Sequence, residues 1–263
     1  MDRPTDQQQQ AADHLQDRSV LRGFAEFGSI HRAQLAAELW SDLRQQEDAS
    51  IRKSLALEIV SNYVVQLEDV LHWILALRRW RQGGMSLFDC VDSVRLERSE
   101  REVDEIAGWN IADFRRELGL PLDQDLERLG YPEASIREFI QGLRIMLERV
   151  QEAVEELSLE ERILPLMYHK TKHGILAVPA DPQIRLRNAL MLASRRGSPI
   201  EEGEGRRKIN TAWIEAVEEG VAHFVRGTYA LSDGIWTVAN VLYHFKFDPS
   251  WQIKPWPYPE VEV

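Results

Sequence analysis

Residues 133–157, EASIREFIQGLRIMLERVQEAVEEL, carry the clearest helical signal in the 263-residue sequence. Their apolar side chains recur at intervals of three and four residues, which places them on one face of an α-helix. Ser135 and Glu138 add the capping-box pattern that begins a helix. The stretch therefore predicts a long amphipathic helix that packs against other helices. Its apolar face consists of Ile136, Phe139, Ile140, Leu143, Met146, Leu147, Val150 and Val154.

A second long helix is predicted upstream, from Ser50 to about Arg81. Its apolar residues begin on one face and widen over Val70–Leu77 until most sides of the helix are apolar. A helix that is apolar nearly all round lies at the centre of a bundle. Gly83-Gly84 is a strong stop signal and ends it.

Two more helices are predicted towards the ends of the chain. Ser29 is a suitable cap for the first, which carries a loose apolar stripe from Ile30 to Leu43. Asn210 is a suitable cap for the last, which extends from Thr211 to Phe247. The expected fold class is therefore mainly all-α, with a bundle of four long helices.

The other segments set the expected domain organisation. Residues 1–28 begin Gln- and Asp-rich and are predicted to be a flexible N-terminal segment. Residues 29–247 are predicted to form one helical domain with two insertions, of short helices at 85–132 and of a small β-hairpin or pair of extended segments at 175–210. Residues 248–263 contain four prolines and predict an extended tail.

The composition is that of an ordinary globular protein. With 43 Asp and Glu against 32 Lys and Arg, the net charge of -11 excludes a protein that coats nucleic acid by its overall charge. The lone cysteine, Cys90, excludes an internal disulfide and a cysteine-based zinc knuckle. Residues 1–12 lack the apolar core of a secretory signal. We therefore expect a cytoplasmic location, no membrane association and no cofactor.

Residues 162–174, RILPLMYHKTKHG, contain the side chains that are candidates for catalysis or metal binding. On a helix, Arg162, His169 and His173 fall near one face. One interpretation needs no function, because cations in the last turn of a helix interact favourably with its dipole and its last carbonyl groups. Lys170 and Lys172 fit that interpretation equally well.

The spacing of Arg162 and His169, with six residues between them, resembles the motif of the HEPN family. Members of that family are small all-α bundles, often metal-independent ribonucleases of toxin–antitoxin and phage-defence systems with active sites formed across a symmetric dimer. The resemblance implies that His169 is the general acid/base, that Arg162 clamps the phosphate, and that the partners are RNA and a second copy of the chain. The chain departs from the motif at Ile163, where the nucleases carry a polar residue, and at Pro165. The ending KTKHG is also similar to helix ends in several uncharacterised bacterial proteins.

A metal site is the alternative chemical interpretation. His169 and His173 are four residues apart, so both imidazoles reach one ion on a helix. The central helix offers His72, together with Glu68 and Asp69. Three histidines from two helices resemble the DinB-type metal bundles, which makes His72, His169 and His173 the candidate ligands.

Basic residues gather in two further places. Arg78, Arg79 and Arg81 end the central helix around Trp80, which is a candidate for stacking on a base. The other group surrounds the loop at 197–205 and predicts a local anion-binding edge, with the solvated surface of a helix end or sheet edge as the alternative. The candidate anion-binding residues are Lys170, Lys172, Arg195, Arg196, Arg206, Arg207 and Lys208.

The tail is a candidate interaction segment. Trp251, Trp256 and Tyr258 lie on a proline-fixed chain that loses little entropy on docking, either onto its own bundle or, through residues 251–258, onto a protein partner. Taken together, the sequence predicts an interaction or regulatory protein that forms homodimers, with RNA targeting as the leading specific hypothesis. A metal-binding bundle and a non-catalytic dimeric scaffold are the alternatives.

Overall fold

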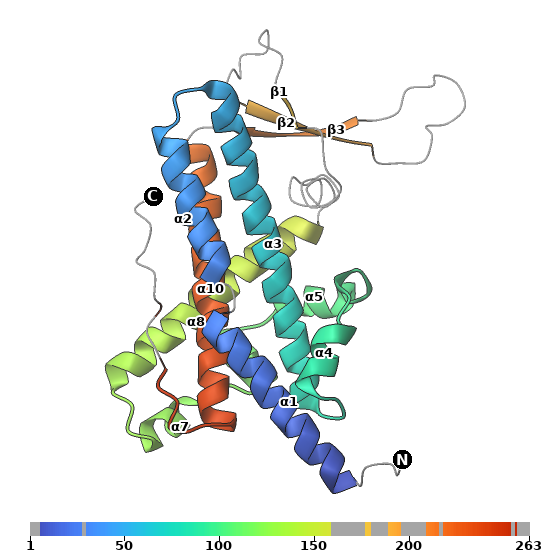
Figure 1. Ribbon diagram of the computed structural model, residues 1–263, viewed down its shortest axis with the longest axis vertical. Coiled ribbons are helices and arrows are strands. Elements are labelled where there is room, and N and C mark those ends of the chain that lie inside the picture. Colours follow the sequence, from blue (N-terminus) through green and yellow to red (C-terminus); the bar gives the residue numbers. More distant parts are fainter. Residues whose placement is uncertain are drawn as a thin grey trace, which may run out of the picture. The chain divides into compact units, whose positions relative to one another are not determined.

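The computed structural model describes residues 6–27, 30–158, 177–179, 189–195, 209–215, 218–253 and 256. Within these ranges the chain is mostly helical (Figure 1), so the prediction of a mainly all-α protein is confirmed. No helix in the described part of the chain is long and apolar enough to span a membrane. The long helices are α1 (Asp6–Phe27), α2 (Ile30–Gln45), α3 (Ala49–Gln82), α8 (Glu133–Ser158) and α10 (Glu218–Lys246).

Short helices fill the region between α3 and α8, where the sequence predicts them. They are α4 (Leu87–Ser93), the 3-10 turn η1 (Leu96–Arg98), α5 (Glu100–Ala107), α6 (Ile111–Leu118) and α7 (Asp123–Arg128). Asn110 caps α6 as expected, since its Oδ1 accepts hydrogen bonds from the backbone N–H groups of Ala112 and Asp113. Gly119 ends α6 in the left-handed region, with φ of 68°, which a side chain rarely adopts.

The prediction of a flexible segment over residues 1–28 is wrong for residues 6–27, which form α1. The helix is held by its buried face, because Leu21 and Ala25 are 0% and 2% exposed. Gln, Ala, Leu and Arg are all good helix formers, so the polar composition of this segment is compatible with a helix once one face is packed.

The last helix begins later than predicted. Residues 211–215 belong to strand β3 (Ile209–Glu215), and α10 begins at Glu218. The sequence of β3, INTAWIE, contains β-branched and aromatic residues that favour extended chain, a preference that the expected helix start at Asn210 overlooked.

Strands β1 (Ala177–Pro179), β2 (Ala189–Arg195) and β3 form an antiparallel sheet in the order β1-β2-β3. The register places Val178 opposite Met191 and Met191 opposite Trp213. The extended chain therefore reaches Glu215, five residues beyond the predicted insertion at 175–210.

The chain divides into two compact units. Unit 1 comprises Met1–Ala33, Gln66–Val154 and Tyr229–Glu260, and unit 2 comprises Gln34–Val65, Glu155–Thr228 and Val261–Val263. The boundaries between the units fall inside α2, α3, α8 and α10, and at 260/261 in the tail, rather than at the limits of the predicted insertions. The short helices α4–α7 belong to unit 1 together with the helices that they contact.

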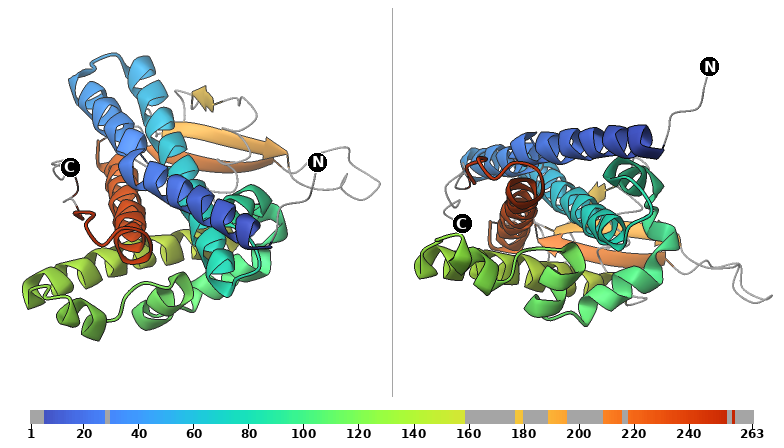
Figure 2. Two further views of the ribbon diagram at one scale, coloured as in Figure 1. Left: turned by 60° about the horizontal axis from the view of Figure 1, so that its bottom comes forward. Right: turned by 90° about the horizontal axis from the view of Figure 1, so that it is seen from below.

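Unit 1 is held together by contacts between distant parts of the chain. In Figures 1 and 2, α8 crosses the C-terminal half of α10, where Gly234 lies against the side chain of Met146. Gln151 of α8 joins the helix to the turn after α5, since its Nε2 donates to the carbonyl groups of Ile106, Ala107 and Trp109. The core of this unit includes Ile74, Leu75, Leu77, Phe114, Leu118, Leu143, Met146, Val238 and Leu242.

Unit 2 contains the turn between α2 and α3. Asp48 caps α3, because its Oδ1 accepts from the backbone N–H groups of Ser50 and Ile51. Arg52 closes the turn by donating to the carbonyl of Leu43 at 2.9 Å. Deeper in the unit, the ring of Tyr63 packs edge-on against that of Phe224, with centroids 5.4 Å apart.

Candidate functional site

The residues proposed for RNA cleavage lie outside the described part of the chain. Arg162, His169 and His173 all fall between residues 159 and 176, as do Lys170 and Lys172. The catalytic assignment from the HEPN resemblance therefore stays a prediction, and so does the three-histidine metal site.

The candidate anion-binding edge is described only at its start. Arg195 is the last residue of β2, and the strand register pairs it with Ile209 at the start of β3. The intervening residues Arg196, Arg206, Arg207 and Lys208 lie outside the described ranges. The pairing of β2 with β3 brings the two flanks of this loop together in the backbone.

His72 is the one candidate metal ligand that the structure places. The imidazole is half-buried on α3, and its Nε2 donates to the carbonyl oxygen of Val91 on α4 at 2.7 Å. A carbonyl oxygen only accepts, so this bond fixes the proton on Nε2 and leaves Nδ1 as the nitrogen that can bind a metal. His72 thus joins α3 to α4, as a satisfied histidine in a packed helix does.

Charged groups lie beside His72 on the same face of α3. Asp69, one turn earlier, lies 3.9 Å from Nε of Arg32, measured to its Oδ2. Burial by surrounding atoms raises the pKa of Asp69, while Arg32 opposes that shift and Glu68 adds to it. Across the described residues, however, no three His, Cys, Asp or Glu side chains come together in a group that would hold a metal ion. The arrangement is therefore a mixed charge cluster.

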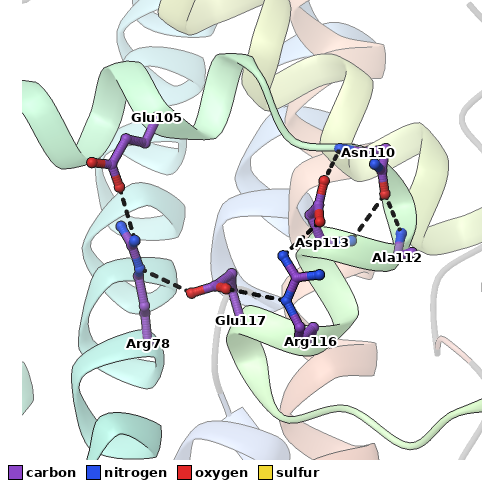
Figure 3. Close-up of polar contacts among 7 residues, drawn as sticks. All are labelled: Arg78, Glu105, Asn110, Ala112, Asp113, Arg116 and Glu117. Atoms are coloured by element: carbon purple, nitrogen blue, oxygen red, sulfur yellow. Dashed lines mark hydrogen bonds and ion pairs between the residues drawn. The ribbon is translucent and has the colours of Figure 1, made fainter.

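The basic end of α3 is occupied by acids from α5 and α6. Arg78 donates from Nη2 to Glu105 at 2.8 Å and from Nε to Glu117 at 3.2 Å. Figure 3 shows Glu117 shared between Arg78 and Arg116, which in turn contacts Asp113 in the first turn of α6. These cations hold three helices together, so a structural role explains Arg78 without an anionic ligand.

Arg79 likewise contacts side chains of its own chain, those of Ser99 and Glu102. Its guanidinium contacts the carboxylate of Glu102 and donates to Oγ of Ser99 at 3.0 Å. Ser99 makes no side-chain hydrogen bond to the start of α5, although Ser99 and Glu102 match the sequence pattern of a capping box. The hydrogen bond from Arg79 lowers the pKa of Glu102.

Trp80 is engaged on both its edge and its ring. The indole Nε1 donates to Oδ2 of Asp17 at 2.8 Å. The ring stacks on Phe247 at 6.1 Å between centroids, and Nζ of Lys246 lies 4.5 Å from its centre. These contacts give Trp80 a structural role within unit 1, and the hypothesis that it stacks on a base stays a prediction.

Asp17 is an organising residue that the sequence reasoning missed. Its side chain is nearly buried, and besides the indole of Trp80 it accepts a hydrogen bond from the backbone N–H of Leu87. It thereby joins α1 to the end of α3 and to the start of α4. The spacing of Asp17, Leu21 and Ala25 at intervals of four was the available signal that one face of this segment is packed.

The tail contacts its own chain. Trp251 donates through Nε1 to Oδ1 of Asn240, and Trp256 packs edge-on against Trp236 at 5.7 Å between centroids. Both contacts are with α10, as expected for a tail that covers its own helices. Tyr258 lies outside the described residues.

Comparison of the sequence with protein-family models and curated proteins, and of the structure with solved structures, gives no match. The residues of this chain are therefore the only basis for a proposed function.

Proposed function

We propose that this protein is a helical interaction or regulatory protein that acts as a homodimer. The observation that carries the proposal is a set of large apolar side chains on the surface of unit 1. Met85 and Phe88, at the start of α4, are 45% and 48% exposed, and Leu122 and Leu129, at the two ends of α7, are 55% and 57% exposed. The first pair lies at α4 and the second at α7, so each short helix exposes two large apolar side chains that a partner could cover.

The polar side chains in the described helices support the same proposal. Arg78, Arg79 and His72 bind groups of their own chain, and Asp17 fastens α1. These polar groups hold the helices of unit 1 together, whereas about half of each of the four apolar side chains stays exposed and can contact a partner. Burying a Leu or Phe side chain contributes about 1.5–3 kcal/mol, so a second copy that covers them gains binding free energy.

The dimer is tested by light scattering on the full chain over a range of concentrations. We expect a mass of twice 30.4 kDa for the wild-type protein. The double variant Leu122→Glu/Leu129→Glu places a charge at each exposed site and is expected to give the monomer mass. Gln124→Glu, on the same short helix, is the matched control and is expected to stay dimeric. A monomeric wild-type protein, or a double variant that dimerises as tightly as the control, contradicts the proposal.

A second candidate is an RNA-targeting, metal-independent ribonuclease. It is favoured by the Arg162 and His169 motif, which follows α8 directly in a mostly helical chain. In this candidate His169 transfers protons near neutral pH and Arg162 stabilises the charge that develops on the phosphate. Cations around the 196–208 segment supply local attraction for RNA on an acidic protein. A ribonuclease assay separates the two candidates.

A further inference from the structure

The chain reverses direction at the end of α10. The carboxylate of Asp248 accepts from the backbone N–H of Ser250 at 3.1 Å, and the backbone N–H of Trp251 donates to the carbonyl of Asp248 at 2.9 Å. Beyond this turn, Trp251 contacts Asn240 and Trp256 contacts Trp236. Trp256 therefore meets α10 about one turn earlier in the helix than Trp251 does.

Trp251 makes contacts through its indole N–H group, its ring and its backbone carbonyl. Its indole Nε1 donates to Oδ1 of Asn240 at 3.0 Å, and its carbonyl oxygen accepts from Nδ1 of His244 at 2.7 Å. Its ring meets that of Tyr243 edge-on at 4.8 Å, and the guanidinium of Arg22 lies 5.9 Å from the ring centre. The surface formed by Arg22, Asn240, Tyr243 and His244 is therefore a socket for this tryptophan.

The socket also holds α1. The buried Asn240 donates from Nδ2 to the carbonyl of Ala25 at 3.2 Å, while its oxygen accepts from Trp251. Arg18 of α1 donates to Oη of Tyr243 at 3.2 Å and lies 3.6 Å from the carboxylate of Asp248. One amide and one tyrosine thus bind α1 on one side and the tail on the other.

The structure assigns the tail a regulatory role as a latch: we propose that docking of Trp251 holds α1 against α10, and that release of Trp251 frees α1 without unfolding the rest of unit 1. Loss of the indole removes the donor from a buried amide oxygen and the ring from beneath Arg22, so the contacts of α1 with α10 weaken together, while Asp17 still joins α1 to α3 and α4.

Helix α6 keeps its cap at Asn110 and α8 keeps the hydrogen bonds of Gln151, and none of these contacts involves the socket. Tyr131, which precedes α8, does contact the socket, because its hydroxyl lies 3.3 Å from Nε2 of His244.

One buried group favours opening of the latch. The indole Nε1 of Trp236, beside Trp256, is buried and has no hydrogen-bond partner among the described residues. A buried donor without a partner is unfavourable, and lifting the tail returns it to water. Burying this N–H group raises the free energy of the closed latch but not of the open one. This difference favours a contact that can open and close.

Hydrogen exchange on the full chain tests the latch by comparing Trp251→Ala with the wild-type protein. We expect amides in the second half of α1 to exchange about tenfold faster in the variant, with unchanged rates in α6 and α8. Gln252→Ala, the exposed neighbour, is the matched control and is expected to leave all rates unchanged. Unchanged α1 rates in Trp251→Ala overturn the proposal, and so does an equal acceleration of α1, α6 and α8, because that pattern reports global destabilisation.

The coupling is also tested from the side of α1. Arg18→Gln removes the contacts of α1 with Tyr243 and Asp248 and leaves every direct contact of Trp251 in place. Because coupling between two sites is reciprocal, we expect faster exchange at the amide of Trp251 in this variant. An unchanged rate there shows that α1 and the tail bind α10 independently and overturns the latch.

Discussion

Asn240 and Gln66 of unit 1 both have fully buried amide side chains, but their hydrogen bonding differs. Asn240 bonds to Ala25, to Trp236 and to Trp251, whereas in the described part of the chain neither Nε2 nor Oε1 of Gln66 has a hydrogen-bond partner. A buried polar group without a partner costs about 1–3 kcal/mol, and a paired one recovers that cost. The same side-chain chemistry therefore has opposite effects at the two positions.

Replacing each amide with leucine makes this difference measurable. We expect Gln66→Leu to raise the free energy of unfolding by about 1–2 kcal/mol, because it removes an unpaired amide and keeps the volume. Asn240→Leu is expected to lower it by about 2–3 kcal/mol, because it leaves the indole of Trp251 without its acceptor. Urea denaturation of both variants is the measurement. A change of the same sign in both would show that hydrogen bonding does not determine their stability.

The contribution of Asp17 to stability is expected to require both of its carboxylate oxygens. In Asp17→Asn the new NH2 group must face either the indole N–H of Trp80 or the backbone N–H of Leu87, and both are donors. We expect the free energy of unfolding to fall by about 1–3 kcal/mol in urea denaturation. Gln16→Ala, at an exposed position of the same helix, is the control and is expected to change it little. Equal stability of Asp17→Asn and wild type would rule out Asp17 as the anchor of α1.

The crossing of α8 and α10 depends on a glycine. A Cβ built at Gly234 overlaps the Cβ, Cγ and Sδ atoms of Met146, whereas nothing lies within 4 Å of a Cβ built at Gly142 of α8. We expect Gly234→Ala to lower the free energy of unfolding by about 1–3 kcal/mol because the helices must separate. Gly142→Ala, the matched control, is expected to raise it by about 0.5–1 kcal/mol through helix propensity. Thermal denaturation of the pair distinguishes packing from propensity, and a stabilised Gly234→Ala would disprove the close crossing.

The attachment of α5 to α3 predicts a dependence on pH. The hydrogen bond from Arg79 lowers the pKa of Glu102 below its value of about 4.3 in an unfolded chain. A carboxyl group with a lowered pKa stabilises the folded state above the unfolded pKa, and this contribution is lost as the pH falls through the folded pKa. We expect Glu102→Gln to lower the free energy of unfolding at pH 7 by about 0.5–1 kcal/mol and to reduce its fall below about pH 4.

A double-mutant cycle is the control for that prediction. Arg79→Gln is expected to remove the same increment as Glu102→Gln, and the double variant is expected to lose little more than either single variant. Fully additive losses would show that the two residues stabilise the protein separately.

Helices with a regular apolar pattern were predictable as elements. Helices α3 and α8 begin and end within about two residues of their predicted limits, the accuracy expected where a helix frays. The sequence pattern was misleading where tertiary contacts determine the partner of a side chain. Ser99 and Glu102 match a local capping pattern, yet both bind Arg79, a residue 20 and 23 positions away. Helix α1 was not predicted, because the polar composition of the segment indicates a flexible chain and only a narrow face of the helix is buried.

At the scale of the whole molecule, the sequence shows charges but not their partners. The cluster at Arg78 and Arg79 looks like an anion site when read along the chain, because Glu105 and Glu117 lie 27 and 39 residues away. Only folding brings these acids to the end of α3. The division into two units was likewise hidden, because it falls within α2, α3, α8 and α10 and leaves no linker in the sequence.

The proposed function is binding of a second copy of the chain, and RNA cleavage through Arg162 and His169 is the competing candidate. The most direct measurement is degradation of a labelled RNA by the full chain in the presence of a chelator, compared with His169→Ala and with Arg162→Ala. The account predicts the same background rate for all three proteins, with circular dichroism confirming that each variant is folded. RNA cleavage by the wild-type protein that is lost in both folded variants would contradict the account and establish the ribonuclease.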